Sequence, residues 1–339
     1  MKNSVEGNRL IYWDNLKAIL IFCVCLGHVL LPVLQEEIVG RAIHSLTFFV
    51  YSFHMPAFIF VSGFFSKSYV KRLKNGTVQV NKLFGFLCLY FLFKLINSVK
   101  DFFISGVFIF DILREEAAPW YMLGMVWWLL MIPVFAQIGA RKAISAALLF
   151  SLFVPLWDSL SNYLVSGRTI NWLPFFVAGY FFDKRLLEII KRRKAYIIAA
   201  VMILIMAYLF IYKEIDYFYK FNTLVFASQS YASMNQRKIV CLILKILFLL
   251  GSSAMILAVM TICPTKEYWF TYIGQRTLGI YIGHCIVRDI VFKAGGYQPF
   301  LSNHFVFLAF SIILSVVLVI VFSWKPFNDF VKLPFTIKI

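Results

Sequence analysis

The sequence predicts an all-α integral membrane protein, a bundle of about ten transmembrane helices with both termini in the cytoplasm. Three observations lead to this fold class. Of the 339 residues, 61% are hydrophobic and the mean hydropathy is +0.81, whereas the apolar share of a soluble domain is typically about half. Apolar runs of membrane-spanning length recur along the whole chain. The Lys and Arg residues gather in alternate loops between those runs.

Each predicted span is an apolar segment of suitable length. A helix needs about 20 mostly apolar residues to cross a bilayer. Ten segments approach this length, near residues 16–34, 44–65, 83–105, 119–138, 143–160, 170–187, 196–212, 239–262, 270–290 and 304–324. The fifth and sixth are short, and the third contains a charged residue, Lys94.

The distribution of basic residues tests this division independently, because cytoplasmic loops carry an excess of Lys and Arg. With the N-terminus in the cytoplasm, 20 of the 33 Lys and Arg residues fall on the cytoplasmic side, 9 fall outside and 4 lie within spans. The net charge of +17 therefore indicates cytoplasmic loops and contact with anionic lipids. Nucleic acid is not an expected partner, whereas the lipid bilayer is.

No soluble domain is expected anywhere in the chain. The longest loop, Lys213 to Lys238, has 26 residues, and the first apolar run lacks the cleavage site of a signal peptide. We therefore expect residues 1–339 to form a single membrane domain, with its chemistry inside the bundle or at its mouths. We interpret the cysteines as small buried hydrophobic residues, neither disulfide-bonded nor zinc ligands, because they lie in or at the ends of apolar segments without metal-type spacing: Cys23, Cys25, Cys88, Cys241, Cys263 and Cys285.

Histidines are the main candidates for chemistry, because ionisable groups inside a membrane are costly and usually functional. At 1.5 Å per residue, His28 lies roughly 18 Å and His284 roughly 21 Å above the cytoplasmic ends of their helices, and His54 lies roughly 15 Å below the outer end of its helix. In a core about 30 Å thick, these three histidines reach a similar level. For His44 and His304, which lie at helix edges, a structural role is favoured.

One face of the first helix carries further polar groups. Lys17 precedes His28 by eleven residues and Asp14 precedes it by fourteen, so both lie within about 40° of His28 around the helix axis. The three residues could line a path from the cytoplasm to the middle of the membrane. Two structural alternatives remain open at this point: a histidine that only bonds a neighbouring helix, and an Asp14–Lys17 ion pair at the headgroup level.

Five sequence blocks, taken in order, resemble a known family. They are YWDNLKAILIFCVCLGH, in which Lys17 precedes His28, FVYSFHMPAFIFVSGFF, PWYMLGMVWW, GRTINWLPFFVAGYFF and IGQRTLGIYIGH. This pattern is similar to that of the membrane-bound acyltransferase-3 family, and within it to the fucose 4-O-acetylase-like group. The sequence has Lys17 where many members carry arginine, and it has few arginines before the third span; lysine keeps the charge but loses the bidentate fork.

The resemblance implies O-acetyl transfer from cytoplasmic acetyl-CoA to a hydroxyl of a sugar or cell-surface glycan. No bound cofactor is implied, since acetyl-CoA is a co-substrate, and no metal is expected. A hydroxyl needs a positioned base, most often histidine, so we assign His28 as general base or as covalent acyl relay. Asp14 and Lys17 would shape the donor path, while His54 and His284 would position the acceptor or polarise the acyl carbonyl.

The substrates would contact further basic and aromatic residues. We expect Lys71, Arg72 and Lys82 to bind the phosphates of acetyl-CoA. Arg168, Trp120 and Arg276 are assigned to the acceptor, and the alternative for Trp120 is the ordinary interfacial belt of membrane proteins. The expected location is a bacterial cytoplasmic membrane.

Two other classes of function remain as alternatives. A transporter of a glycan precursor or small molecule could use the intramembrane histidines as a proton relay, although such relays usually include buried carboxylates, and Asp and Glu avoid the interiors of the predicted spans. A non-enzymatic glycan-binding subunit is the third class, and the presence of His28 argues against it.

Overall fold

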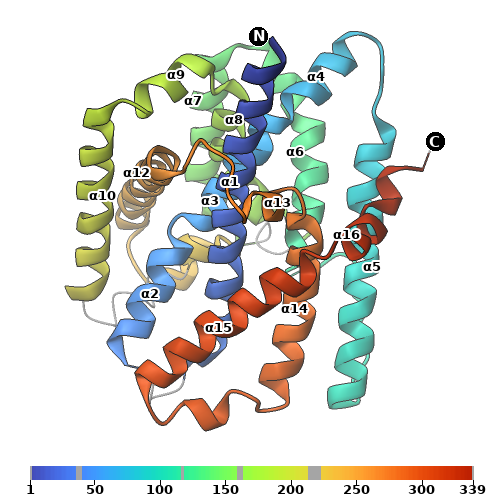
Figure 1. The fold of residues 1–339 in the computed structure, drawn as a ribbon, viewed down its shortest axis with the longest axis vertical. Helices are drawn as coiled ribbons and strands as arrows, with labels where there is room; N and C mark the ends of the chain where they lie inside the picture. Colours follow the sequence, from blue (N-terminus) through green and yellow to red (C-terminus); the bar gives the residue numbers. More distant parts are fainter. Residues whose placement is uncertain (1, 36–39, 116–117, 159–162, 213–222, 338–339) are drawn as a thin grey trace. The chain divides into compact units, whose positions relative to one another are not determined.

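The computed structural model describes residues 2–35, 40–115, 118–158, 163–212 and 223–337. In this part of the chain every regular element is helical, and the β structure is limited to one isolated bridge between Arg114 and Tyr163. The predicted all-α class is therefore confirmed. The α-helices (Figure 1) are α1 Lys2–Leu30, α2 Arg41–Tyr51, α3 His54–Phe65, α4 Lys67–Lys74, α5 Val80–Ser105, α6 Trp120–Gln137, α7 Ala140–Phe153, α8 Ser166–Phe181, α9 Lys184–Ile190, α10 Arg193–Tyr212, α12 Lys238–Ile262, α13 Thr271–Gly274, α14 Thr277–Lys293, α15 His304–Phe322 and α16 Lys325–Lys332.

Each of the ten predicted spans overlaps at least one helix of the described residues. By length and composition, six described segments can cross a membrane: Ile11–Leu34, Ala42–Lys74, Val80–Ser105, Trp120–Gln137, Lys238–Ile262 and His304–Phe322. This makes the chain a multi-pass membrane protein. Helices α7, α8 and α14 have 14, 16 and 17 residues, shorter than an average span. The total of ten spans and the cytoplasmic position of both termini remain predictions.

The second predicted span is interrupted next to His54. Helix α2 ends at Tyr51 and α3 begins at His54. Pro56 has no backbone N–H, so the carbonyl of Ser52 cannot receive the helical bond from that residue. Ser252 Oγ donates to this carbonyl instead, at 2.6 Å. The apolar sequence continues through the break, which is why hydropathy alone predicted one helix.

Two other predicted spans also divide. The segment 170–187 splits into α8 and α9, because Asp183 caps α9 by accepting from the backbone N–H of Arg185. The segment 270–290 splits into the single turn α13 and the longer α14, with Gln275 and Arg276 between them.

The chain forms two compact units, which are described separately. Unit 1 comprises Met1–Phe58, Asp183–Phe218 and Gly251–Phe330. Within it, α1 packs against α2, α13, α14 and α15 (Figure 1). Its apolar core contains Leu26, Val29 and Leu30 of α1 together with Phe292 of α14 and Phe307 of α15. Helix α1 is thus the central element of unit 1.

Unit 2 comprises Ile59–Phe182, Tyr219–Leu250 and Val331–Ile339. Within this unit, α3 and α8 cross at two glycines. A Cβ added to Gly63 would lie 2.0 Å from the carbonyl oxygen of Phe176, and one added to Gly179 would lie 1.9 Å from that of Phe60. Small residues let membrane helices approach at backbone distance. This contact explains the glycines in the blocks FIFVSGFF and FFVAGYFF.

A loop turns back along α5 in unit 2 and supplies the polar partners of Lys94. After Gly106, in the left-handed conformation at φ +74°, Ser98 Oγ donates to the carbonyl of Ile109 at 2.5 Å and Tyr90 Oη to that of Ile112 at 2.9 Å. Lys94 Nζ bonds Glu115 Oε2 at 2.9 Å and the carbonyl of Arg114 at 2.6 Å.

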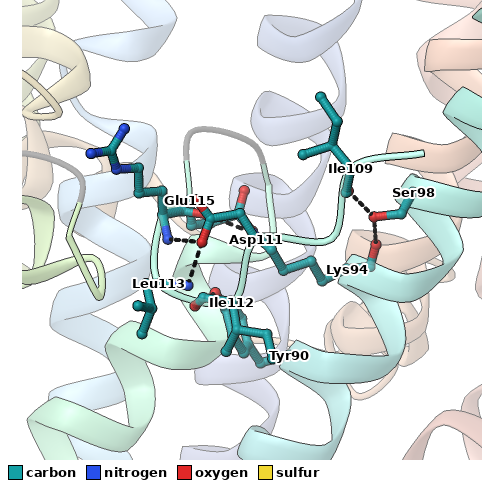
Figure 2. Close-up of polar contacts among 9 residues, drawn as sticks. Tyr90, Lys94, Ser98, Ile109, Asp111, Ile112, Leu113 and Glu115 are labelled. Carbon is teal, nitrogen blue, oxygen red and sulfur yellow. Dashed lines mark hydrogen bonds and ion pairs between the residues drawn. The ribbon is translucent and has the colours of Figure 1, made fainter. Parts of the chain in front are cut away.

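Figure 2 shows these bonds, together with those from the backbone N–H groups of Leu113 and Arg114 to Asp111 Oδ1. The loop reaches Tyr90, fifteen residues before Ser105, and so runs back about 22 Å along the helix. The charge that weakened the third predicted span is therefore neutralised by a carboxylate that arrives from this loop.

Substitution of either crossing glycine should destabilise unit 2. In Gly179→Ala or Gly63→Ala the new methyl group would overlap a backbone oxygen, and overpacking of this kind costs about 1–3 kcal/mol. We expect a fall of several degrees in the unfolding temperature of the purified protein in detergent. Gly251→Ala is the control, because its Cβ would meet the methyl group and sulfur of the Met206 side chain at ordinary contact distances of 3.6 and 3.8 Å. Equal unfolding temperatures for Gly179→Ala and this control would contradict the close approach.

Removal of the Glu115 carboxylate should leave the Lys94 cation buried without its counter-charge. The two side chains are 5% and 11% exposed, and breaking a buried pair on one side typically costs about 3–5 kcal/mol. We expect Glu115→Gln to be strongly destabilised in thermal unfolding, and Lys94→Met/Glu115→Gln to recover most of the loss. A double variant that loses the sum of the two single effects would contradict the pairing.

Candidate functional site

Three histidine rings, for which the sequence predicted a similar depth but not a contact, meet in unit 1. The ring centroid of His28 on α1 lies 5.1 Å from that of His284 on α14, with the planes stacked, and 6.4 Å from that of His54 at the start of α3. His54 and His284 are fully buried, whereas His28 is partly exposed. The break before α3 brings His54 to this position, and the continuous α1 brings His28.

The hydrogen bonds of this cluster define which nitrogens carry protons. His284 Nδ1 lies 2.7 Å from the carbonyl oxygen of Ile280, and a carbonyl only accepts, so Nδ1 of a neutral His284 carries the proton and Nε2 accepts. His28 Nδ1 lies 2.9 Å from this Nε2 and therefore donates to it. The Nε2 atom of His28 is left with a lone pair, which is the state required of a general base.

His54 is oriented in the same way. Its Nδ1 donates to the carbonyl of Val50 at 2.8 Å, and its Nε2 is buried and has no hydrogen-bond partner among the described residues. In the neutral ring this Nε2 is an acceptor. Since His54 and His284 both give their N–H group to a backbone carbonyl, neither offers an N–H to an acyl carbonyl in this arrangement. Of the two roles expected for them, positioning a hydroxyl is therefore favoured over polarising the acyl group.

Asp14 and Lys17 form an ion pair at 2.8 Å on α1, with side chains 12% and 20% exposed. Gln275 Nε2 also donates to Asp14, at 3.1 Å. The two side chains therefore form the ion pair that the structural alternative expected, and it is largely buried next to Gln275. The level of this pair in the membrane, and the role of Asp14 and Lys17 in a donor path, remain predictions.

The middle of α1, at Asp14 and Asn15, is fixed to residues 264–275. Asn15 Nδ2 donates to the carbonyls of Pro264 and Lys266, at 3.0 and 2.7 Å, while its Oδ1 accepts from Thr271 Oγ1 at 2.6 Å. A Cβ on Gly274 would lie 1.8 Å from the backbone oxygen of Asp14. The glycine of the IGQR block therefore allows backbone contact with α1.

Lys191, which lies outside the membrane-spanning segments, contacts both α1 and the end of α12. Lys191, which follows α9, donates to the carbonyl of Thr261 at 2.8 Å and to that of Cys263, and it lies over the Tyr12 ring at 4.8 Å. Burial lowers the pKa of Lys191 to about 8. Tyr12 Oη in turn donates to the carbonyl of Met260 at 2.9 Å, so the end of α12 is tied to α1.

The residues expected to bind substrates divide between the units. In unit 2, the guanidinium group of Arg168 on α8 lies over the ring of Trp120, the first residue of α6, at 5.4 Å. Both side chains are 8% exposed. In the same unit Lys71 and Arg72 are exposed on α4, and the partly exposed Lys82 lies near the Tyr69 ring at 5.9 Å.

Arg276 belongs to unit 1, at the start of α14. Its Nη1 donates to the carbonyl of Ser323 at 2.8 Å, and its guanidinium group lies over the Tyr272 ring at 5.0 Å. These contacts fix Arg276 to the end of α15 and favour a structural role. Its expected contact with the acceptor remains a prediction.

Sequence reasoning gave no role to several polar residues that the structure makes prominent. Gln275 and Asn15 lie inside the quoted blocks, but nothing in their spacing shows that Gln275 contacts α1 or that Asn15 contacts α13.

Lys245, 1% exposed within α12, bonds Asn171 Oδ1 at 2.9 Å in unit 2. The signal in the sequence was a lysine inside an apolar span. Cys285 Sγ lies 3.3 Å from His284 Nε2 and 3.6 Å from His28 Nδ1. All six cysteines are free.

The comparisons with known proteins identify the family of the chain. A family model described as an acyltransferase domain, that of the acyltransferase-3 family, matches residues 10–324. No curated protein and no solved structure matches the chain. The match includes all three histidines and both units, and the chain therefore belongs to the acyltransferase-3 family of membrane acyltransferases.

Proposed function

We propose that the protein transfers an acetyl group from cytoplasmic acetyl-CoA to a hydroxyl of a sugar or cell-surface glycan, with His28 as the general base. The observation that carries this proposal is the hydrogen-bond chain from the Ile280 carbonyl through His284 to His28. This chain fixes the tautomer of His28 so that Nε2 can accept a proton. Acetyl as the acyl group and a glycan as the acceptor follow from the resemblance to the fucose 4-O-acetylase-like group.

The reaction is a nucleophilic substitution at the thioester. His28 Nε2 takes the proton of the acceptor hydroxyl while its oxygen attacks the acetyl carbon. The carbon–sulfur bond then breaks, and the departing thiolate of CoA receives the proton from His28. During this step the imidazolium form of His28 still donates through Nδ1 to His284 Nε2, so the positive charge remains hydrogen-bonded. The free acceptor nitrogen of buried His54 suits a second hydroxyl of the sugar.

A covalent variant uses the same atoms. His28 Nε2 would attack the thioester itself, carry the acetyl group and pass it to the acceptor. The two variants differ in whether acetylated His28 accumulates when donor is supplied without acceptor.

The transporter alternative finds less support. The family assignment indicates acyl transfer, and within the described helices the carboxylates of Asp14 and Asp289 form ion pairs with Lys17 and Arg288. Acetyl-CoA-dependent acetylation by the purified protein supports the enzyme, whereas counterflow of labelled substrate without acetyl-CoA would support transport.

Substitution of His28 should abolish acetyl transfer while the protein still folds. General-base catalysis contributes roughly 10²–10⁴-fold, so His28→Ala and His28→Gln should lose at least about a hundredfold in transfer of labelled acetyl groups by isolated membranes, at equal protein levels. Gln can keep a hydrogen bond to His284 but is not a base. His44→Ala serves as the control with near wild-type transfer. Wild-type rates in His28→Gln would rule out the base role.

The exposed cations of α4, Lys71 and Arg72, should bind the phosphates of acetyl-CoA. Neutralising Lys71 and Arg72 together, as Lys71→Gln/Arg72→Gln, should raise the KM for acetyl-CoA severalfold and weaken its dependence on salt, with a small change in kcat, because exposed charges steer and hold phosphates. The matched control is Arg141→Gln/Lys142→Gln, which removes two exposed cations at the start of α7. An equal KM in both double variants would show that the donor phosphates bind elsewhere.

A further inference from the structure

Cys285 adds a third donor atom to the pair of histidines. His28 Nδ1, His284 Nε2 and Cys285 Sγ lie within 4.8 Å of one another. The individual separations are 2.9 Å between the two nitrogens, 3.3 Å from Sγ to His284 Nε2 and 3.6 Å from Sγ to His28 Nδ1. Acetyl transfer by His28 and His284 makes no use of the thiol, so its position next to both rings is unexplained by that reaction.

These separations are close to those of ligands around one tetrahedral metal ion. With Zn–N bonds of about 2.0–2.1 Å and a Zn–S bond of about 2.3 Å, neighbouring ligand atoms are roughly 3.3–3.6 Å apart. The two sulfur–nitrogen distances already fall in this range, and the nitrogens need to separate by a few tenths of an ångström. Three protein ligands would leave a fourth position open.

The surroundings of the ligands also suit a metal. A metal-bound histidine usually donates its other N–H to a carbonyl or carboxylate, and His284 Nδ1 donates to the carbonyl of Ile280. Two imidazoles and a thiolate favour zinc and other borderline or soft ions over Mg²⁺ and Ca²⁺, which take oxygen ligands. His284 and Cys285 are 0% and 2% exposed, while His28 is partly exposed.

We propose that His28, His284 and Cys285 form a reversible site for Zn²⁺, and that the bound ion inhibits acetyl transfer. This inference rests on the proposed function for its inhibitory effect, but not for the binding itself. On binding, Cys285 loses its thiol proton to solvent and becomes the thiolate ligand. His28 moves its proton from Nδ1 to Nε2 so that Nδ1 can bind the ion. The nitrogen that accepted the hydroxyl proton then carries one of its own and can no longer act as a base.

The proposed site departs from the expectation, drawn from the sequence, that no cysteine is a zinc ligand. That expectation relied on spacing along the chain, and His28 and Cys285 are separated by 257 positions. The remaining cysteines stay outside this site; Cys263, for example, directs its thiol to the backbone carbonyl of Tyr12 at 3.7 Å.

The test uses the purified full-length protein in detergent or nanodiscs, titrated with Zn²⁺ against a chromogenic chelator and assayed for acetyl transfer at each concentration. We expect one Zn²⁺ per chain in the wild type and inhibition that follows occupancy. Cys285→Ser should keep acetyl transfer and should need at least about ten times more Zn²⁺ for half-inhibition, because a serine hydroxyl is a poor zinc ligand. Cys263→Ser is the matched control and should bind and respond like the wild type.

A second measurement keeps binding separate from activity. Co²⁺ in place of Zn²⁺ should give a thiolate-to-metal absorption band in the wild type and in Cys263→Ser, and none in Cys285→Ser. Absence of both this band and stoichiometric Zn²⁺ binding would overturn the site. Equal Zn²⁺ sensitivity of Cys285→Ser and wild type would overturn it as well. A protein that shows the band but transfers no acetyl group without metal would keep the binding site and refute the proposed function.

Discussion

The hydrogen bond between His28 and His284 is the interaction on which the proposed chemistry depends. It joins α1 to α14, and the carbonyl of Ile280 sets its direction by fixing the proton of His284 on Nδ1. A bond of this kind between two helices requires that they keep both their axial register and their rotation, because a displacement of one residue would turn a side chain by about 100°.

That register is set in the middle of α1. Asn15 bonds three groups in the segment 264–271, and Gly274 touches the backbone of Asp14. These contacts lie thirteen or fourteen residues from His28, or about 20 Å along the helix. Since α1 is unbroken from Lys2 to Leu30, its helical geometry carries this alignment to the histidine. Asp14 and Asn15, in the block YWDNLKAILIFCVCLGH, thus help to hold α1 and its His28 in position.

Several polar groups in the apolar helices are paired locally. Lys94 bonds Glu115, Lys245 bonds Asn171, and the carbonyl freed by Pro56 is bonded by Ser252. Such pairing is expected because an unsatisfied polar atom in an apolar environment is costly. The Nε2 atom of His54, 0% exposed next to His28, has no hydrogen-bond partner among the described residues, and the proposed acceptor hydroxyl would supply one.

The sequence allowed some of these features to be predicted and concealed others for physical reasons. The common level of His28, His54 and His284 could be predicted because the rise of a helix is constant. The break before His54 could not be predicted from hydropathy, because the segment Ala42–Lys74 that contains it is apolar enough to cross a membrane. The partner of Lys94 arrives from a loop 21 positions later, and Cys285 meets His28 only through tertiary packing; neither follows any helical period.

The central claim, that His28 removes the proton from an acceptor hydroxyl, is tested most directly by mass spectrometry of surface glycans. The samples come from cells that carry the wild-type gene, the His28→Gln variant or no gene. We expect an O-acetyl group on one glycan in the wild type and its absence in the other two strains, with equal amounts of membrane-inserted protein in the wild-type and His28→Gln strains. The same O-acetyl group at wild-type abundance in the His28→Gln strain would contradict it.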